Sequence, residues 1–224
     1  MGTMHGPEAG RPTRRRGAPA GSIRQDSMAR ILAAAEPVFA RAGFEGAAMA
    51  EIAAAAGLPK ANLHYYFGTK ERLYRALLEE VLATWLAEAA DWIVPHRHPA
   101  EALGGYVRAK MTLSRTRPQA SRIFAGELLR GAPHILEFLG GELRRQVTAM
   151  SAVIEGWVAA GLMDPIAPPH LFFTIWAMTQ TYADFAVQVA AVLGKPALDE
   201  DDFAAATETV AALVLKGAGV RAHP

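Results

Sequence analysis

The sequence lacks several features that would assign the protein to other classes. It contains no cysteine, which excludes disulfide bonds and thiolate metal ligands. No uninterrupted apolar run reaches the roughly 20 residues that a membrane span needs, and no charged-then-apolar leader is recognisable. We therefore expect a cytoplasmic protein without membrane contact. Its 224 residues are 51% hydrophobic, which is enough to build a sizeable core.

Motifs typical of enzymes are also missing. The sequence contains no HExxH motif, no phosphate-cradling glycine loop and no nucleophile elbow. The histidines are scattered, and the only close pair, His96 and His98, lies in a proline-flanked loop without a third ligand nearby. We therefore predict no catalytic residue, no metal site and no cofactor. An all-α enzyme and a protein-binding adaptor remain as alternative classes.

Net charge is weak but unevenly distributed. The chain carries +1 overall, so a nucleic-acid contact would have to be local. Residues 1–21 hold four arginines and one glutamate, a net charge of +3, which leaves −2 for the rest. Rich in Gly, Pro and Ala and without apolar periodicity, these residues are predicted to form a disordered basic arm. The arm is either a solvated tail or a segment that touches phosphates or the minor groove.

What the sequence does contain is a helix-turn-helix pattern over Met49–Lys70. The apolar positions before Gly57 fall on one helical face, and glycine suits the end of a helix because it reaches left-handed backbone angles without steric cost. Pro59 stands where a second helix would begin, a position that needs no backbone donor. Two helices around such a short turn are typical of DNA-binding proteins.

The second helix of this pattern supplies the predicted DNA contacts. They are Lys60, Ala61, Asn62, His64, Tyr65 and Lys70. Lys60 and Asn62 match the edges of guanine and adenine, and Ala61 can meet a thymine methyl group. The other three are placed for phosphate contacts, which orient the protein without reading sequence. The alternative for Lys60 and Tyr65 is an ordinary solvated side chain, whereas Tyr66 and Phe67 are expected to pack inward.

Helical spacing continues on both sides of the motif. A helix over 22–42, capped by Ser22 or Asp26 and disturbed by Pro37, would cover the motif. Further helices are expected over 69–92, 100–116, from 118 onward, 134–160, 170–193 and 199–216, and no strand pair is found. The predicted architecture is all-α with about nine helices. It comprises a three-helix DNA-binding domain over 22–68, a helical effector-binding and dimerisation domain over 69–217, and a tail over 218–224.

The helix expected over 170–193 carries the candidate effector residues. Phe173, Trp176, Gln180 and Asp184 share one helical face, and Tyr182 adds a polar group. An indole can stack on a flat ring, and the glutamine amide has the donor and acceptor that a pyrimidine imide requires. In the alternative interpretation, Trp176 belongs to the core, and Gln180 and Asp184 bond within the chain or the dimer.

A single helix-turn-helix makes too few base contacts for a long site, so we expect a two-fold homodimer that reads two half-sites. The last two long helices expose more apolar width than packing within one chain needs. The predicted interface residues are Ile175, Phe185, Val189, Phe203, Val210 and Val214.

A family resemblance strengthens this interpretation. The stretch AEIAAAAGLPKANLHYYFGTKERLYRALLEEV resembles the N-terminal domain of the TetR family of transcriptional regulators. The segments SRTRPQASRIFAGELLRGAP and WAMTQTYADFAVQV are similar to a regulator of pyrimidine utilisation in that family. The resemblance implies a dimeric repressor that binds a palindromic operator of double-stranded DNA. A small-molecule effector, such as uracil or thymine, would release it.

The sequence departs from the family pattern on the DNA-facing side. Ala47 and Ala48 stand where the family usually has Thr or Ser, and Pro59 replaces a Ser-like residue. The operator sequence therefore cannot be transferred from a relative. A regulator of the same fold that senses an unrelated apolar or aromatic ligand is the alternative.

Overall fold

The computed structural model describes residue 2 and residues 20–221. Within them the chain is helical, without a β-strand. The elements are α1 (Ala20–Gly46), α2 (Met49–Ala56), α3 (Lys60–Phe67), α4 (Lys70–Trp92), α5 (Pro99–Thr116), α6 (Pro118–Leu129), α7 (Leu136–Phe138), the π-helical turn η1 (Leu139–Leu143), α8 (Arg144–Ala159), α9 (Pro168–Asp184), α10 (Ala186–Val192) and α11 (Glu200–Gly217). The all-α class is confirmed.

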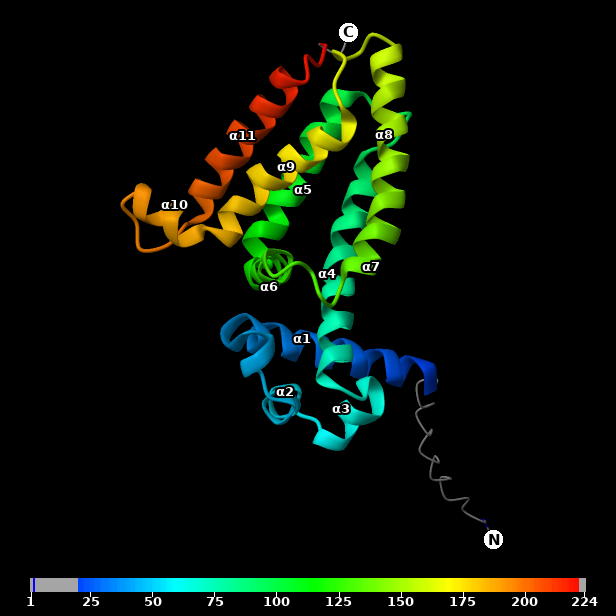
Figure 1. The fold of residues 1–224 in the computed structure, drawn as a ribbon, viewed down its shortest axis with the longest axis vertical. Helices are drawn as coiled ribbons and strands as arrows, with labels where there is room; N and C mark the ends of the chain where they lie inside the picture. Colours follow the sequence, from blue (N-terminus) through cyan, green and yellow to red (C-terminus); the bar gives the residue numbers. More distant parts are fainter. Residues whose placement is uncertain (1, 3–19, 222–224) are drawn as a thin grey trace.

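One end of the molecule is built from α1, α2 and α3, packed around the start of α4 (Figure 1). Helix α1 begins at Ala20, so Ser22 and Asp26 lie inside it and neither is its cap, contrary to prediction. The backbone leaves helical angles at Gly43, with φ 67° and ψ 178°, and not at Pro37. Most of the arm predicted over 1–21, and residues 222–224 of the predicted tail, lie outside the described residues.

Helix α4 joins this end to the rest of the molecule (Figure 1). Its first turn is capped by Thr69, whose hydroxyl accepts a hydrogen bond from the Arg72 N–H at 3.3 Å. Its apolar stripe, which includes Leu73, Leu77 and Val81, is buried. The buried stripe packs α4 against the apolar core along most of its length.

The other end contains α5, which packs against both α9 and α11, and α8, which packs against α9 (Figure 1). Two helices predicted as continuous are interrupted. The segment 134–160 contains the π-helical turn η1, with Gly140 and Gly141 inside it. The segment 170–193 breaks at Phe185, where the backbone adopts φ −114° and ψ 27°, although neither proline nor glycine marks the place.

The buried apolar residues form two cores, and α4 contributes to both. The first joins α1, α2 and α3 with α4 from Leu73 to Leu86 and with α6. The second starts at Ala89, near the end of α4, and joins α5, α8, α9 and α11. Among the described residues, the structure has no helix of the length and apolarity that crossing a membrane requires.

Candidate nucleic-acid interface and effector cavity

The turn between α2 and α3 has the backbone geometry that sequence reasoning expects. Gly57 adopts the left-handed conformation, with φ 62° and ψ 36°, and the Leu58 N–H donates to the Ala53 carbonyl at 3.0 Å. The Arg30 guanidinium donates to the Ala56 carbonyl at 2.8 Å and so ties the end of α2 to α1. These contacts hold the start of α3 in place.

Helix α3 is divided into a buried and an exposed side. Leu63 and Phe67 point into the core, and Tyr66 is half-buried. The predicted DNA-contact residues all reach the surface: Lys60, Ala61, His64 and Tyr65 are exposed, and Asn62 and Lys70 are half-buried. Tyr65 is 74% exposed, which is unusual for a large aromatic side chain. An outward aromatic, polar and basic surface is suited to DNA.

Two of these residues also have partners within the chain. The His64 ring hydrogen-bonds through Nδ1 to the Gly68 carbonyl at 2.9 Å. The Lys70 ammonium donates to the Glu45 carbonyl at 3.0 Å and lies 4.7 Å from the centre of the Phe44 ring. Both contacts shape the loop between α3 and α4, so a phosphate contact by Lys70 would have to be shared with Glu45.

The starts of α2 and α3 lack side-chain caps. Ala48 precedes α2 and Pro59 precedes α3, and neither provides a side-chain hydrogen bond to the first turn. The uncapped starts agree with the departures noted in the sequence. They leave backbone N–H groups at these helix starts that a phosphate can accept from.

A cavity of about 150 Å³ lies at the other end of the molecule. Its lining comes from α4, α5, α6, η1, α8 and α9 and is mostly apolar: Leu82, Trp85, Leu86, Phe124, Leu128, Leu139, Leu143 and Met150. The remaining lining residues, Tyr106, Lys110, Trp176 and Gln180, carry polar atoms. An apolar pocket with a few polar groups is typical of small-molecule sites.

The structure brings only two of the five predicted effector residues to this cavity. Trp176 and Gln180 line it, whereas Phe173, Tyr182 and Asp184 do not. Phe173 is half exposed, with its ring 5.6 Å from the Trp176 ring. Tyr182 packs on Phe203.

Asp184 forms a hydrogen bond within the chain, as the alternative interpretation stated. Its carboxylate accepts a hydrogen bond from the Ser121 hydroxyl at 2.6 Å, which ties the end of α9 to α6. Burial raises the pKa of Asp184, and the hydrogen bond from Ser121 and the charge of Lys110 oppose that rise.

Sequence reasoning missed the polar groups that α5 contributes to the cavity. The Tyr106 hydroxyl accepts a hydrogen bond from the Trp176 indole at 2.7 Å. Lys110 is 2% exposed, and its ammonium lies 4.2 Å from the centre of the Trp85 ring. Burial lowers the pKa of Lys110 to about 7, partly offset by Asp184. The sequence did hold a signal for the burial of Lys110, because this lysine follows Val107 by three residues and so lies on the apolar stripe of α5.

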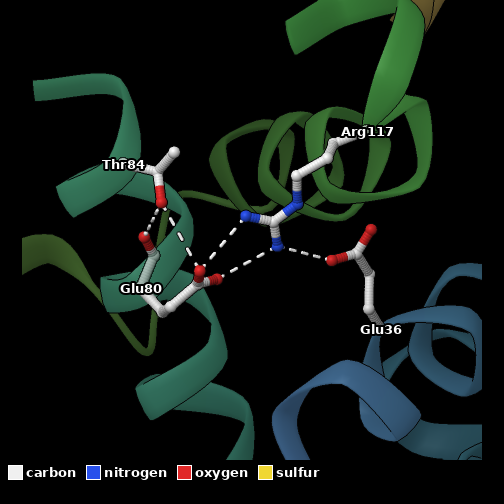
Figure 2. Close-up of polar contacts among 4 residues, drawn as sticks. All are labelled: Glu36, Glu80, Thr84 and Arg117. Atoms are coloured by element: carbon white, nitrogen blue, oxygen red, sulfur yellow. Dashed lines mark hydrogen bonds and ion pairs between the residues drawn. The ribbon is translucent and has the colours of Figure 1, made fainter. Parts of the chain in front are cut away.

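Arg117, between α5 and α6, connects the two ends of the molecule (Figure 2). Its guanidinium donates to both carboxylate oxygens of Glu80 on α4, at 3.1 and 3.0 Å, and to Glu36 on α1 at 2.6 Å. Burial lowers the pKa of Arg117, but the hydrogen bonds to Glu80 and Glu36 outweigh it, and the net shift is upward. The guanidinium thus stays charged between two carboxylates.

A second contact between the two ends involves Glu127 of α6, which is completely buried. Its carboxylate accepts a hydrogen bond from the His134 backbone N–H at 2.7 Å. The His134 ring packs against Phe44 of α1 and Tyr74 of α4. Burial, reinforced by Glu127, raises the pKa of Tyr74 to about 12. Together with Arg117, these contacts tie α6 to the end that carries α3.

The predicted dimer residues fall into two groups. Ile175, Val210 and Val214 are buried within the chain, so they already serve its own core. Phe185 is exposed, and Val189 and Phe203 are half-buried. The surface of α9, α10 and α11 is formed by the outer residues of these helices. The exposed apolar residues there are Phe173, Phe185, Val187, Val192, Leu193 and Leu213.

An exposed second helix of a helix-turn-helix, joined to a helical unit with a cavity, defines a DNA-binding regulator. The model of "Bacterial regulatory proteins, tetR family" matches residues 31–77, and that of "YcdC-like protein, C-terminal region" matches residues 78–221. The chain belongs to the TetR family of transcriptional regulators.

Individual relatives agree with this assignment. The chain is 44% identical over 187 residues to the HTH-type transcriptional regulator RutR of Escherichia coli K12, covering 84% of this chain and 88% of RutR. It is 30% identical over 158 residues to the HTH-type transcriptional repressor NicS of Pseudomonas putida, covering 68% and 73%. A tetR-family protein of Rhodococcus RHA1 superposes with a TM-score of 0.69 at 24% identity, covering 88% and 98%. These relatives are regulators, not enzymes.

Proposed function

We propose that this regulator is a repressor that binds a palindromic operator as a homodimer and leaves it when a small molecule fills the cavity. Residues 22–68 would read DNA, and residues 69–217 would bind the effector and the second copy. The observation that carries the proposal is an exposed α3 at one end and a cavity at the other, joined by α4 and Arg117.

The DNA contacts are proposed from the outward side of α3 and from Lys70 at the start of α4. Lys60 and Asn62, at its N-terminal end, would read base edges in the major groove, and Ala61 would meet a thymine methyl group. His64, Tyr65 and Lys70 would contact phosphates and set the orientation of the domain.

The proposed effector is a pyrimidine, uracil or thymine. Trp176 and Gln180 support it, because one offers a flat apolar surface and the other an amide that pairs with an imide. The similarity of two segments to a pyrimidine-utilisation regulator points the same way. The effector would act by binding one arrangement of α4 and α6 more tightly than another. The favoured arrangement would change the distance between the two α3 helices of the dimer. A coupling of about 1–3 kcal/mol lowers DNA affinity about 5- to 150-fold.

Homodimerisation is proposed through α9, α10 and α11. Phe185, Val187 and Val192 leave large apolar surface in water on these helices, which is costly in a monomer. An isologous contact would cover this surface on both copies and place the two α3 helices about one turn of DNA apart.

The test is a mobility-shift titration with DNA from upstream of the gene, over a range of salt concentrations and with or without uracil or thymine. We expect salt-dependent binding that either pyrimidine weakens. Lys60→Ala should lose about 1–3 kcal/mol of binding free energy. The control Arg144→Ala removes the same charge from the exposed start of α8 and should bind like the wild type.

Two outcomes would overturn parts of the proposal. Salt-insensitive binding that Lys60→Ala does not change would reject α3 as the reading helix. Operator binding that neither pyrimidine alters would reject the pyrimidine effector and favour an unrelated apolar or aromatic ligand, for which the largely apolar cavity wall is the supporting observation.

A further inference from the structure

Lys110 is a buried cation that lines the effector cavity without a charged partner. It is 2% exposed, and among the described residues no carboxylate lies within ion-pair distance of its ammonium. Asp184, the acidic group that acts on it, is hydrogen-bonded to Ser121 instead. The Lys110 ammonium lies over the Trp85 ring, 4.2 Å from the ring centre. Burying an unpaired cation costs free energy, so its retention in a regulator's cavity suggests a use.

The polar end of the cavity is rich in hydrogen-bond donors. The Tyr106 hydroxyl accepts from Trp176, so its own proton is left to donate, and no acceptor for it is found in the described part of the chain. The Gln180 amide likewise has no hydrogen bond to a residue that the structure describes. Tyr106 and Lys110 are four residues apart on α5, and they line the cavity together with Trp176 and Gln180 of the adjoining helix α9.

The remaining walls are apolar. Helix α4 contributes Leu82, Trp85 and Leu86, α6 contributes Phe124 and Leu128, η1 contributes Leu139 and Leu143, and α8 contributes Met150. The titratable groups around the ammonium are therefore Tyr106 on its own helix and Asp184 at the end of α9. A ligand that enters meets donors at one end and hydrocarbon elsewhere.

We propose that Lys110 recognises the effector by donating hydrogen bonds to an oxyanion or carbonyl oxygen on a small planar ring. This inference rests on the proposed effector function of the cavity and narrows it. Trp85 and Trp176 offer flat surfaces for the ring, Tyr106 and Gln180 contact its other acceptors, and the ammonium selects against rings without an oxygen acceptor. A wholly apolar ligand would leave Lys110 unpaired and is disfavoured for that reason.

The test compares wild type, Lys110→Met and Lys216→Met by calorimetric titration with uracil, thymine, barbiturate and benzoate. Methionine keeps the length and apolar body of the lysine without the ammonium. Lys216 is exposed near the end of α11 and does not line the cavity, so its substitution is the matched control. For every ring that binds, Lys110→Met should weaken binding about ten- to a hundredfold, the loss of a charged hydrogen bond. Lys216→Met should leave it unchanged.

A second measurement uses only the wild type, in case Lys110→Met does not fold. At about pH 8 most Lys110 side chains are neutral, because burial lowers the pKa to about 7. An anionic ring that pairs with the ammonium must restore its proton. Titrations with barbiturate or benzoate in two buffers of different ionisation enthalpy should therefore report uptake of close to one proton.

The outcomes separate this inference from the proposed effector site. Rings that bind Lys110→Met as tightly as wild type, without proton uptake by the anions, would overturn the role of Lys110 and leave the cavity as the effector site. Binding of benzoate alone, lost in Lys110→Met, would support Lys110 and reject a pyrimidine effector. If no ring binds the wild type, both the role of Lys110 and the pyrimidine effector are rejected.

Discussion

The two ends of the molecule place their polar groups in opposite ways. On α3 the polar side chains are exposed, and the apolar ones, Leu63 and Phe67, point inward. Around the cavity, Lys110 and Tyr106 are buried among apolar walls. An exposed group is hydrated whether or not DNA is present, so it can be changed at little cost to folding. Burying a polar or charged group costs folding free energy, so removing it changes both the stability of the protein and the recognition of a ligand.

The largest expected effect would show whether the ends are independent. Leu63→Ala removes a completely buried side chain of α3 and should cost about 2–5 kcal/mol of unfolding free energy, because it leaves a cavity in the first core. DNA binding should fall with it, while effector binding should fall less, because no residue of α1, α2 or α3 lines the cavity and α4 lines it only from Leu82 onward. Urea unfolding and calorimetric titration measure the two effects. Equal losses of both would show that the ends fold as one unit.

The next prediction concerns pH and the buried end. The pKa of Lys110 is about 7 in the folded protein and 10.5 without burial. Between these values the unfolded chain binds more protons than the folded one, so stability must rise with pH in this window. From about pH 7 to about pH 9, wild type should gain about 2 kcal/mol relative to Lys110→Met. Denaturant unfolding at both pH values measures the difference. An equal change in unfolding free energy with pH in the two proteins would contradict the prediction.

Arg117 tests the connection between the ends. Arg117→Met leaves Glu36 and Glu80 without their shared cation and should cost about 1–2 kcal/mol, since these groups are partly exposed. The reduction in operator affinity caused by the effector should also shrink. Arg115→Met is the matched control, because its partner Glu200 is largely exposed and at 3.4 Å. That change should stay within about 0.5 kcal/mol. If the effector lowers operator affinity as much in Arg117→Met as in the wild type, the ion pairs of Arg117 do not link the two sites.

The smallest expected effect is a gain in stability at the end that carries α3. Ala48→Ser would supply the missing cap of α2, with Glu51 at the third helical position to complete a capping box. We expect about 1 kcal/mol of added stability without a change in effector binding. Ala54→Ser, an exposed position within the same helix, is the control and should not stabilise. Thermal unfolding measures the stability of both variants. An equal change in stability would mean that a serine at position 48 does not act as a cap of α2.

Prediction from sequence succeeded where local chemistry decides the structure. The turn at Gly57, the start of α3 after Pro59 and the buried side of α3 follow from backbone preferences and helical spacing within a few residues. These properties do not depend on which distant segment packs nearby. The helix-turn-helix and the all-α class could therefore be predicted before any contact was known.

The cavity could not be predicted in this way. Its residues come from six elements, and helical spacing cannot tell which stripe of a helix faces a core and which faces an opening. Phe173 shares a helical face with Trp176 but is exposed, and Asp184 is drawn to Ser121 on another helix. The break at Phe185 has no local signal either.

By itself, the sequence determined the second helix of the helix-turn-helix, its turn and the helical class, because these depend on neighbours along the chain. The tertiary structure decided that Trp176 and Gln180 line a cavity, that Lys110 is buried beside them, and that Arg117 joins α1 to α4. Burial and pairing of these groups arise only when segments far apart in sequence come together, since the cost of a buried charge depends on everything packed around it.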